Sequence, residues 1–204
     1  RAPSKRQVHV LTVIPPIVAE SVADLHLGLM LAVARRMIEG DRSVRASRFP
    51  GSQSNHLAGG YVYRKTIGLV GVGRIGLATA RRARGFDMKI LYTARHRRPE
   101  AEQELGMEYV TIDELLARSD FVSLHPALTA ETRHMIGDKE FAKMKPTAFI
   151  INTARGAVID EKAMVRALKA KKIAGAGLDV FENEPKVPAA LLKMKNVVLT
   201  PHLG

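Results

Sequence analysis

The first part of this chain has the hydrophobic pattern of helices, and its loops are marked by small and polar residues. Residues 17–39 carry apolar side chains around most of the helix circumference. This pattern predicts one long helix buried on more than one side, against another domain or another subunit. A shorter helix is expected from Asp41 to about Arg48, followed by a loop at 49–60. An apolar stretch at 8–14 predicts a strand without an obvious partner in this chain.

The remainder of the chain alternates short apolar runs with helical segments. The expected strands are 67–72, 88–92, 108–110, 120–124, 148–152, 175–180 and 197–200, and the expected helices are 74–84, 100–105, 113–118, 138–144 and 161–171. Thr111 and Glu114 predict a capping box, and Asp138 and Asp160 are expected to cap two later helices. Continuous apolar runs are typical of strands buried on both faces. The pattern therefore predicts the α/β class, with a doubly wound parallel sheet.

The stretch Gly71-Val-Gly-Arg-Ile-Gly76 joins the first of these strands to a helix. Gly71 permits a tight turn, Gly73 allows the backbone to approach a pyrophosphate, and Gly76 allows the helix to pack closely on its strand. Arg74 and Ile75 open that helix, whose N-terminus favours phosphate groups. A glycine turn alone can be purely structural. The order strand, turn, helix favours a dinucleotide site and a Rossmann domain over residues 17–204.

Composition and charge narrow the class of protein. Among 204 residues there is no cysteine, which excludes disulfides and thiolate catalysis and fits a cytoplasmic protein. No apolar run reaches the ~20 residues that span a bilayer, so we expect no membrane partner. Without cysteine, cysteine-ligated metals are excluded, and we expect no metal site. Half of the net charge of +12 lies in residues 81–98, where seven basic residues face Asp87 alone. Charge alone would suit a nucleic-acid surface, but a local site for a phosphorylated cofactor explains its position better, and we expect no nucleic-acid partner.

The end of the second expected strand bears on the choice of cofactor. Sites for NAD usually place Asp or Glu about 20 residues after the glycines, where it bonds the ribose 2′-hydroxyl. Here Arg95 lies 19 residues after Gly76, and the first acid that follows Arg95 is Glu100. Arg95, with Arg97 or His96 as a second donor, suits a 2′-phosphate. The sequence therefore predicts NADP(H) as the preferred cofactor, with NAD(H) as the alternative. These basic residues could also form a solvated surface loop that binds no cofactor.

Three later strand ends carry residues suited to catalysis. Arg155 follows one strand and can bind a carboxylate and polarise the neighbouring carbonyl. His202 follows the last strand and is a candidate acid–base, and Glu184 beside it would orient the ring. Each of these residues alone could be an ordinary surface residue. Because ligands bind beyond the carboxyl ends of parallel strands, the three together favour an active site.

These residues belong to a longer series of matching motifs. The chain resembles the D-isomer-specific 2-hydroxyacid dehydrogenases, especially the glyoxylate/hydroxypyruvate reductases. The matching stretches are 70–76, 119–125, 128–133, 144–146, 151–156, 175–185 and 196–202. The resemblance covers roughly residues 17–204 and implies an oxidoreductase that reduces a small 2-oxo acid, such as glyoxylate or hydroxypyruvate. It also implies a homodimer, in which helix 17–39 contacts the partner subunit or another domain.

The resemblance implies a role for each matched position. Arg155 would bind the carboxylate and carbonyl of the 2-oxo acid, His202 would donate the proton, and Glu184 would pair with His202. Asp179 would hold the nicotinamide carboxamide. The other cofactor contacts implied are Arg74 and Ile75 at the pyrophosphate, Thr153 and Ala154 at the nicotinamide, and Gly204.

The extent of the resemblance leaves alternatives open. The first substrate-binding lobe of the family has no counterpart here beyond residues 1–16, which we interpret as its remnant, and the last helix is also missing. We therefore expect a piece of a longer enzyme. A dinucleotide-sensing corepressor or scaffold of the same fold remains the alternative function, because it would share the same residues.

Overall fold

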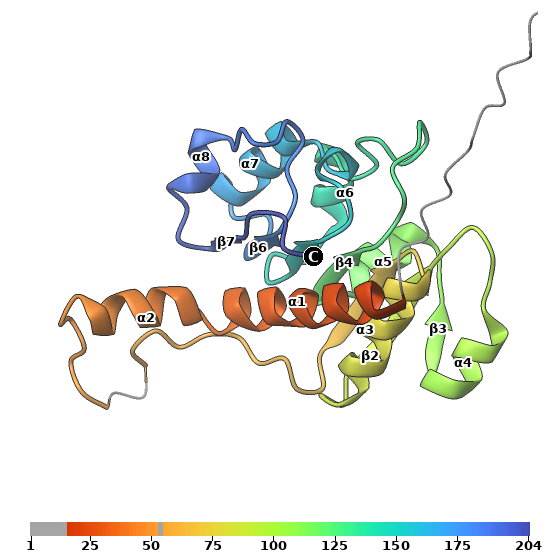
Figure 1. Ribbon diagram of the computed structural model, residues 1–204, viewed down its shortest axis with the longest axis horizontal. Helices are drawn as coiled ribbons and strands as arrows, with labels where there is room; N and C mark the ends of the chain where they lie inside the picture. The colour runs from red at the N-terminus through yellow and green to blue at the C-terminus, as the bar shows by residue number, and fades with distance from the viewer. Residues whose placement is uncertain (1–15, 53–54) are drawn as a thin grey trace, which may run out of the picture.

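The computed structural model describes residues 16–52 and 55–204, which form one seven-stranded sheet with every strand parallel (Figure 1). The strands are β1 (Thr66–Val70), β2 (Lys89–Thr93), β3 (Met107–Tyr109), β4 (Phe121–Leu124), β5 (Phe149–Asn152), β6 (Gly175–Leu178) and β7 (Val197–Leu199). The helices are α1 (Pro16–Ala34), α2 (Met37–Arg45), α3 (Arg74–Arg84), α4 (Pro99–Leu105), α5 (Ile112–Arg118), α6 (Asp138–Lys143), α7 (Glu161–Lys169) and α8 (Ala189–Leu192), with a 3-10 turn η1 (Gly156–Val158). The strand order β3-β2-β1-β4-β5-β6-β7 confirms the doubly wound α/β class.

Each face of the sheet buries its own apolar cluster, because successive strand residues point to opposite sides. Ile150 joins the cluster that contains α5, α6 and α7, whereas Ile151 joins the cluster that contains α1 and α3. Gly68 in β1 marks a close approach of α5 to the sheet, since an added Cβ would lie 2.6 Å from the side chain of Leu115. The two helix layers hold the strand ends, and therefore the loops after them, in fixed positions.

Helix α1 lies against the sheet although it precedes β1 by more than thirty residues. It packs on α3 and on β5, β6 and β7 (Figure 1). By length and apolar composition Ile17–Ala34 could also cross a membrane. However, Ala23, His26 and Met30 are fully buried against the protein core. Its outer face forms ion pairs through Glu20 and Asp24. We therefore assign α1 as a core helix.

The prediction of one helix over residues 17–39 is wrong. The helix ends at Ala34, Arg36 adopts a left-handed backbone with φ 53°, and α2 begins at Met37 instead of Asp41. The backbone N–H of Gly60 donates to the carbonyl of Ala34 at 2.8 Å. An added Cβ on Gly59 would lie only 2.4 Å from the same oxygen. The incoming loop therefore takes the hydrogen-bond position that the next helical turn would need.

Two of the three predicted helix caps are confirmed. Thr111 and Glu114 form the reciprocal capping box, and the Asp160 carboxylate accepts from the first N–H groups of α7. The third is wrong, because Gly137 occupies the cap position and Asp138 is the first residue of α6. There Asp138 pairs with Arg166 of α7 at 2.6 Å. The short elements η1 and α8 were not expected from the sequence.

One expected strand is shorter in the structure, and another lies outside the described residues. The strand expected at 175–180 ends at Leu178, so Asp179 already lies in the loop beyond the sheet. The strand expected at 8–14, with the lobe remnant assigned to residues 1–16, falls on positions outside the described residues except for Pro16. That domain assignment stays a prediction.

Candidate functional site

The glycine turn between β1 and α3 has different constraints at its three glycines. Gly71 has φ +89°, and an added Cβ there would lie 3.1 Å from the backbone of His125 and Pro126. At Gly76 an added Cβ would lie 2.5 Å from the carbonyl oxygen of Gly71. Both glycines are therefore required by packing within the protein.

Gly73 differs from the other two. An added Cβ there would meet no atom within 4 Å, and the residue is exposed at the N-cap of α3 with no side-chain cap. Arg74 is exposed and Ile75 half-buried in the first turn of α3. Because the first N–H groups of a helix lack intrahelical partners, this open surface can bind an anion. These residues fit the pyrophosphate of a dinucleotide.

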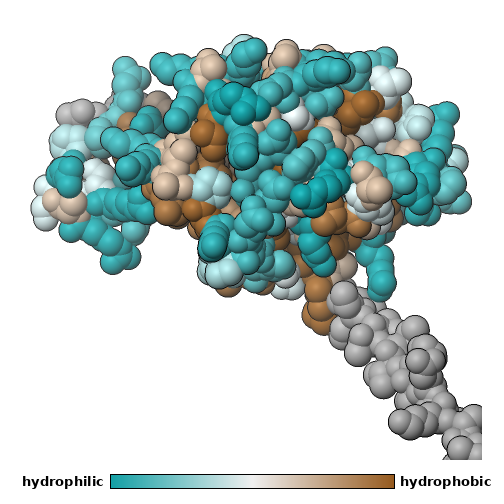
Figure 2. Space-filling model, turned by 90° about the horizontal axis from the view of Figure 1, so that it is seen from above, coloured by the Kyte–Doolittle hydropathy of each residue, from teal (hydrophilic) through white to brown (hydrophobic). Residues whose placement is uncertain are grey.

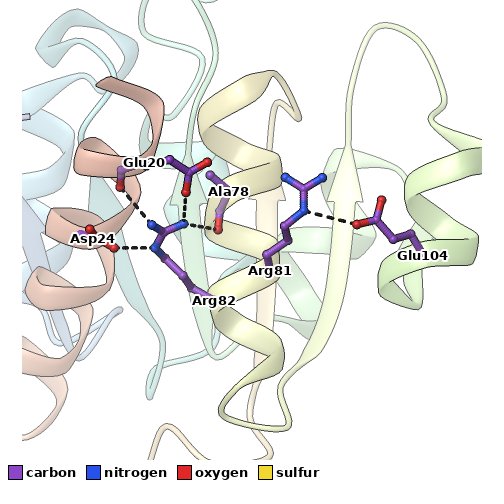
Figure 3. Close-up of polar contacts among 6 residues, drawn as sticks. All are labelled: Glu20, Asp24, Ala78, Arg81, Arg82 and Glu104. Atoms are coloured by element: carbon purple, nitrogen blue, oxygen red, sulfur yellow. Dashed lines mark hydrogen bonds and ion pairs between the residues drawn. The ribbon is translucent and has the colours of Figure 1, made fainter. Parts of the chain in front are cut away.

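The basic segment after the glycine turn is used mostly for ion pairs within the protein. Arg82 in α3 bonds to Glu20 at 2.7 Å and to Asp24 at 2.6 Å, which fastens α3 to α1 (Figure 3). Arg81 pairs with Glu104 of α4 on the other side of the helix (Figure 3). Because these arginines already pair with acids, the interpretation of the whole segment as a cofactor site is too broad. The face of the molecule seen in Figure 2 is mainly hydrophilic, with small apolar patches.

The residues after β2 divide into a restrained and an unrestrained arginine. Arg97 makes two bonds of 2.8 Å to the carboxylate of Glu102, which also accepts from the hydroxyl of Tyr92 at 2.6 Å. The Arg97 guanidinium and then the Tyr92 hydroxyl lower the pKa of Glu102 to about 2. Arg97 also lies 5.8 Å from the centre of the Tyr109 ring. Its guanidinium is thus already engaged by an acid and an aromatic ring.

Arg95 and His96 are exposed and form no ion pair within residues 16–52 and 55–204. The charge of Arg95 contributes to the lowered pKa of Glu131 in the loop after β4, after hydrogen bonding from Thr129 and the Glu131 backbone. A guanidinium without a fixed partner can bind a phosphate without first breaking an ion pair. Arg95 is therefore the best placed of the predicted phosphate ligands, and Arg97 the least available.

The loop after β5 presents Arg155 to solvent. Asn152 closes this loop, since its amide donates to the carbonyl of Arg155 and accepts from the N–H of Ala154, both at 3.0 Å. Gly156 permits a direct backbone contact, because an added Cβ would lie 1.9 Å from the carbonyl carbon of Phe181. The loop after β5 thereby lies directly against the loop after β6. Arg155 is exposed, while Thr153 is buried and Ala154 half-buried.

Glu184 and His202 are in contact at this junction. Nδ1 of His202 lies 2.8 Å from one carboxylate oxygen of Glu184, and the other oxygen accepts from the N–H of Phe181 at 2.9 Å. The hydrogen bond from His202 lowers the pKa of Glu184, with further contributions from Phe181 and the charges of His202 and Arg155. Glu184 and His202, which lie 18 residues apart in the sequence, are thus in contact, and Arg155 is exposed in the neighbouring loop after β5.

Asp179 organises the segment that carries His202. Its buried carboxylate accepts from the Thr200 hydroxyl at 2.5 Å and from the N–H groups of Leu203 and Gly204 at 2.9 Å, while its own carbonyl accepts from the N–H of His202. A carboxylate offers about four lone-pair sites, so one is left for a ligand. Asp179 and Gly204 were expected to contact the cofactor, and in this structure they bond to each other.

A buried polar cluster was not predicted from the sequence. His26 of α1 contacts the hydroxyls of Thr153 and Ser123, and Ser123 also contacts His125 at the end of β4. Desolvation by burial, and secondarily the charge of His125, lower the pKa of His26 well below its ordinary value. In the sequence His26 is one histidine within an apolar helical run, and its partners lie 97 and 127 residues away.

A cavity in the described part of the chain lies away from the predicted site residues. It has a volume of about 660 Å³ and separates α2 from the segment around α8 and β7. None of the predicted site residues lines it. The candidate site is therefore defined by the convergence of loops at the carboxyl ends of the strands, and not by this cavity.

Comparison with known proteins identifies this arrangement. Residues 27–204 match the family model described as D-isomer specific 2-hydroxyacid dehydrogenase, NAD binding domain. The chain is 53% identical over 205 residues to a glyoxylate reductase of Thermococcus litoralis, with 98% of this chain and 62% of that protein covered. A crystal structure of a glyoxylate reductase from Paecilomyes thermophila is similar with a TM-score of 0.86 and 47% identity, covering 93% of this chain and 57% of that one.

A further solved structure carries ligands. It is an NADPH-dependent glyoxylate/hydroxypyruvate reductase from Sinorhizobium meliloti in complex with NADP and malonate, similar with a TM-score of 0.85 and 38% identity over 93% of this chain and 58% of that one. The chain spans about three fifths of the length of the curated relatives it matches, 62% in the example above. The resemblance inferred from the motifs is confirmed by these matches.

Proposed function

Because the chain belongs to the D-isomer specific 2-hydroxyacid dehydrogenases, we propose that it is the cofactor-binding part of an NADP(H)-dependent reductase of a small 2-oxo acid. Glyoxylate and hydroxypyruvate are the proposed substrates. The observation that carries the proposal is the 2.8 Å contact between Glu184 and His202 beside the exposed Arg155. An acid–base group and an anion-binding group on adjacent strand ends are the two elements that reduction of an oxo acid requires.

The chemistry divides among these residues as follows. Glu184 holds Nδ1 of His202, so Nε2 is the ring nitrogen left to carry the proton for the substrate oxygen. Arg155 binds the substrate carboxylate and stabilises negative charge that develops on the neighbouring carbonyl oxygen. The reduced nicotinamide, when bound, supplies the hydride. The protein contributes alignment, the proton and electrostatic stabilisation.

The preference for NADP(H) is supported by the end of β2. Arg95 and His96 are exposed on the loop that follows this strand, and no acid stands at the position that usually bonds a ribose 2′-hydroxyl. A relative of the same fold was crystallised with NADP. NAD(H) remains the alternative cofactor, and the family description names NAD. A homodimer and a cytoplasmic location remain predictions from the sequence.

The direct test is a steady-state assay of the full-length protein that contains this chain. Glyoxylate, hydroxypyruvate and pyruvate would each be offered with NADPH and with NADH, and the value of kcat/KM compared across the six pairs. We expect the largest value for glyoxylate or hydroxypyruvate with NADPH. NADPH binding without turnover on any oxo acid would contradict the reductase and support the dinucleotide-sensing alternative.

A further inference from the structure

Four buried or half-buried polar side chains form a continuous hydrogen-bonded chain between α1 and the sheet. Nδ1 of His26 lies 2.9 Å from the Thr153 hydroxyl, and its Nε2 lies 2.6 Å from the Ser123 hydroxyl. Ser123 in turn lies 2.7 Å from Nε2 of His125. His26 and Ser123 are fully buried, and Thr153 is only 7% exposed. We call these four residues the histidine relay.

The relay joins two parts of the proposed cofactor site. At one end, Thr153 lies in the loop after β5, immediately before Ala154 and Arg155. At the other end, His125 lies against the glycine turn, because an added Cβ on Gly76 would be 3.6 Å from the His125 ring. A displacement of either loop would therefore stretch the same set of hydrogen bonds.

The proton count of the relay leaves only two possible directions for its hydrogen bonds. Both rings are neutral near pH 7, since burial lowers the pKa of His26 and lowers that of His125 to about 3. A neutral imidazole has one donor and one acceptor, and the serine hydroxyl has one hydrogen. Ser123 therefore donates to one ring and accepts from the other. Reversing that bond would also reverse the bond between His26 and Thr153.

The direction of the relay decides what Thr153 can offer to a ligand. If His26 donates to Thr153, the threonine hydroxyl hydrogen is free to be donated elsewhere. If Thr153 donates to His26, only its oxygen lone pairs remain for another partner. The imidazole of His26 thus sets whether Thr153 acts as a donor or as an acceptor, although His26 itself is closed off from solvent.

We propose that His26 is a positioning residue of the cofactor site, which acts through Thr153 on the nicotinamide half of the dinucleotide. This inference rests on the proposed function, because it needs a nicotinamide beside Thr153. The alternative is that the relay only ties α1 to the sheet. The two readings differ in whether the loss of His26 affects the nicotinamide half of the cofactor selectively.

The test compares NADP with 2′-phospho-ADP-ribose, which lacks only the nicotinamide. Affinities would be measured by titration calorimetry on the full-length protein and on its His26→Leu and Thr153→Val variants. A lost neutral hydrogen bond should weaken NADP binding roughly 3- to 10-fold in each variant. 2′-Phospho-ADP-ribose should bind each variant as tightly as it binds the parent protein. The double variant should lose no more than either single one, because both changes break the same interaction.

The His26→Gln variant provides the rescue control. Its amide can still donate to or accept from Ser123, so we expect weaker losses than with His26→Leu. Thr153→Val is nearly the same shape as the parent residue, so it keeps the test decisive if His26→Leu fails to fold.

Three outcomes would overturn the proposal. Equal losses for NADP and the fragment would indicate a structural tie, and unchanged NADP affinity in Thr153→Val would remove the link to the nicotinamide. A parent protein that binds neither ligand would overturn the proposed function as well. This last outcome is recognised from the parent protein alone, before any variant is compared.

Discussion

The carboxylate of Glu184 lies between two donors, Nδ1 of His202 at 2.8 Å and the N–H of Phe181 at 2.9 Å. The backbone bond fixes the carboxylate, and the fixed carboxylate then orients the imidazole. The loop after β6 and the loop after β7 thus hold each other in place. Because the pKa of Glu184 is lowered, first by its bond to His202, the carboxylate stays ionised throughout the neutral range.

Substituting these residues should separate catalysis from cofactor binding. In the full-length enzyme we expect His202→Ala to lower kcat on glyoxylate by ~10²–10⁴-fold, the usual contribution of a general acid. Glu184→Gln should lower kcat on the order of 10²-fold, since a neutral amide orients the ring less well. The dissociation constant for NADPH should stay within about 2-fold of the parent value in both. Parent turnover in His202→Ala would contradict the assignment.

Two glycine substitutions should give opposite results. Gly73 has φ −76°, and a methyl group added there would meet no atom within 4 Å. Gly73→Ala should therefore change the free energy of unfolding by less than ~0.5 kcal/mol. Its NADPH affinity should fall on the order of 10-fold, because the methyl group would occupy the pyrophosphate position. Gly76→Ala should instead destabilise the fold by ~1–3 kcal/mol, since its Cβ would lie 2.5 Å from the Gly71 carbonyl. Urea unfolding and NADPH titration measure the two effects, and unchanged affinity in Gly73→Ala would contradict the site.

Arg95→Asp should change cofactor selectivity. The substitution replaces a phosphate ligand with an acid, so we expect the affinity for NADPH to fall at least ~10-fold and that for NADH to change little. Arg45→Asp is a matched control, since Arg45 is also exposed but lies on α2 and pairs with Asp41. Fluorescence titration with both cofactors measures the ratio. Equal losses for NADPH and NADH would exclude a phosphate contact at Arg95.

The two histidines of the relay should make the protein sensitive to mild acid. The pKa of each ring is lower in the folded protein than the ordinary 6.5, so the unfolded chain binds more protons below that pH. Stability is therefore full above about pH 6.5 and declines as the pH falls, with a slope near 1.4 kcal/mol per pH unit for each histidine. The window from about pH 6.5 to 4.5 precedes most carboxylate protonation.

His125→Phe should flatten that decline, and His56→Phe, at an exposed position, should not. The measurement is the free energy of unfolding in urea from pH 7 to pH 4.5. A parallel decline in the parent protein and His125→Phe would show that His125 is not kept neutral by the fold.

The histidine relay also predicts the tautomers of its two rings. Because Ser123 bonds to Nε2 of both rings and carries one hydrogen, one ring must be protonated at Nε2 and the other at Nδ1. Nitrogen NMR of the ¹⁵N-histidine-labelled protein, with His26 and His125 identified by substitution, distinguishes the two forms. The same tautomer at both rings would contradict the single direction of the relay.

Local signals were sufficient for much of the fold. The capping box at Thr111 and the cap at Asp160 involve residues within three positions, so the sequence displays both partners. The glycine turn and the alternation of strands and helices were likewise predictable. The pairing of Glu184 with His202 was expected from their places at adjacent strand ends, and the structure brings them into contact.

Interactions between distant segments were not predictable. The end of α1 depends on Gly60, whose N–H occupies the Ala34 carbonyl, and no pattern within residues 17–39 reveals that contact. The role of His26 depends on Ser123 and Thr153 in the same way. Arg97 is the exception, because its partner Glu102 lies only five residues away and could have been recognised in the sequence.

Asp179 makes exposure a poor measure of mobility at the end of the described chain. Residues 201–204 are all exposed, yet the amide hydrogens of His202, Leu203 and Gly204 all point to this one buried residue. Their exchange with solvent deuterium is therefore limited by local opening of the turn, and not by access of water. The proposed proton donor thus stands on a rigid backbone at the surface, so binding a substrate costs little ordering of the segment that carries it.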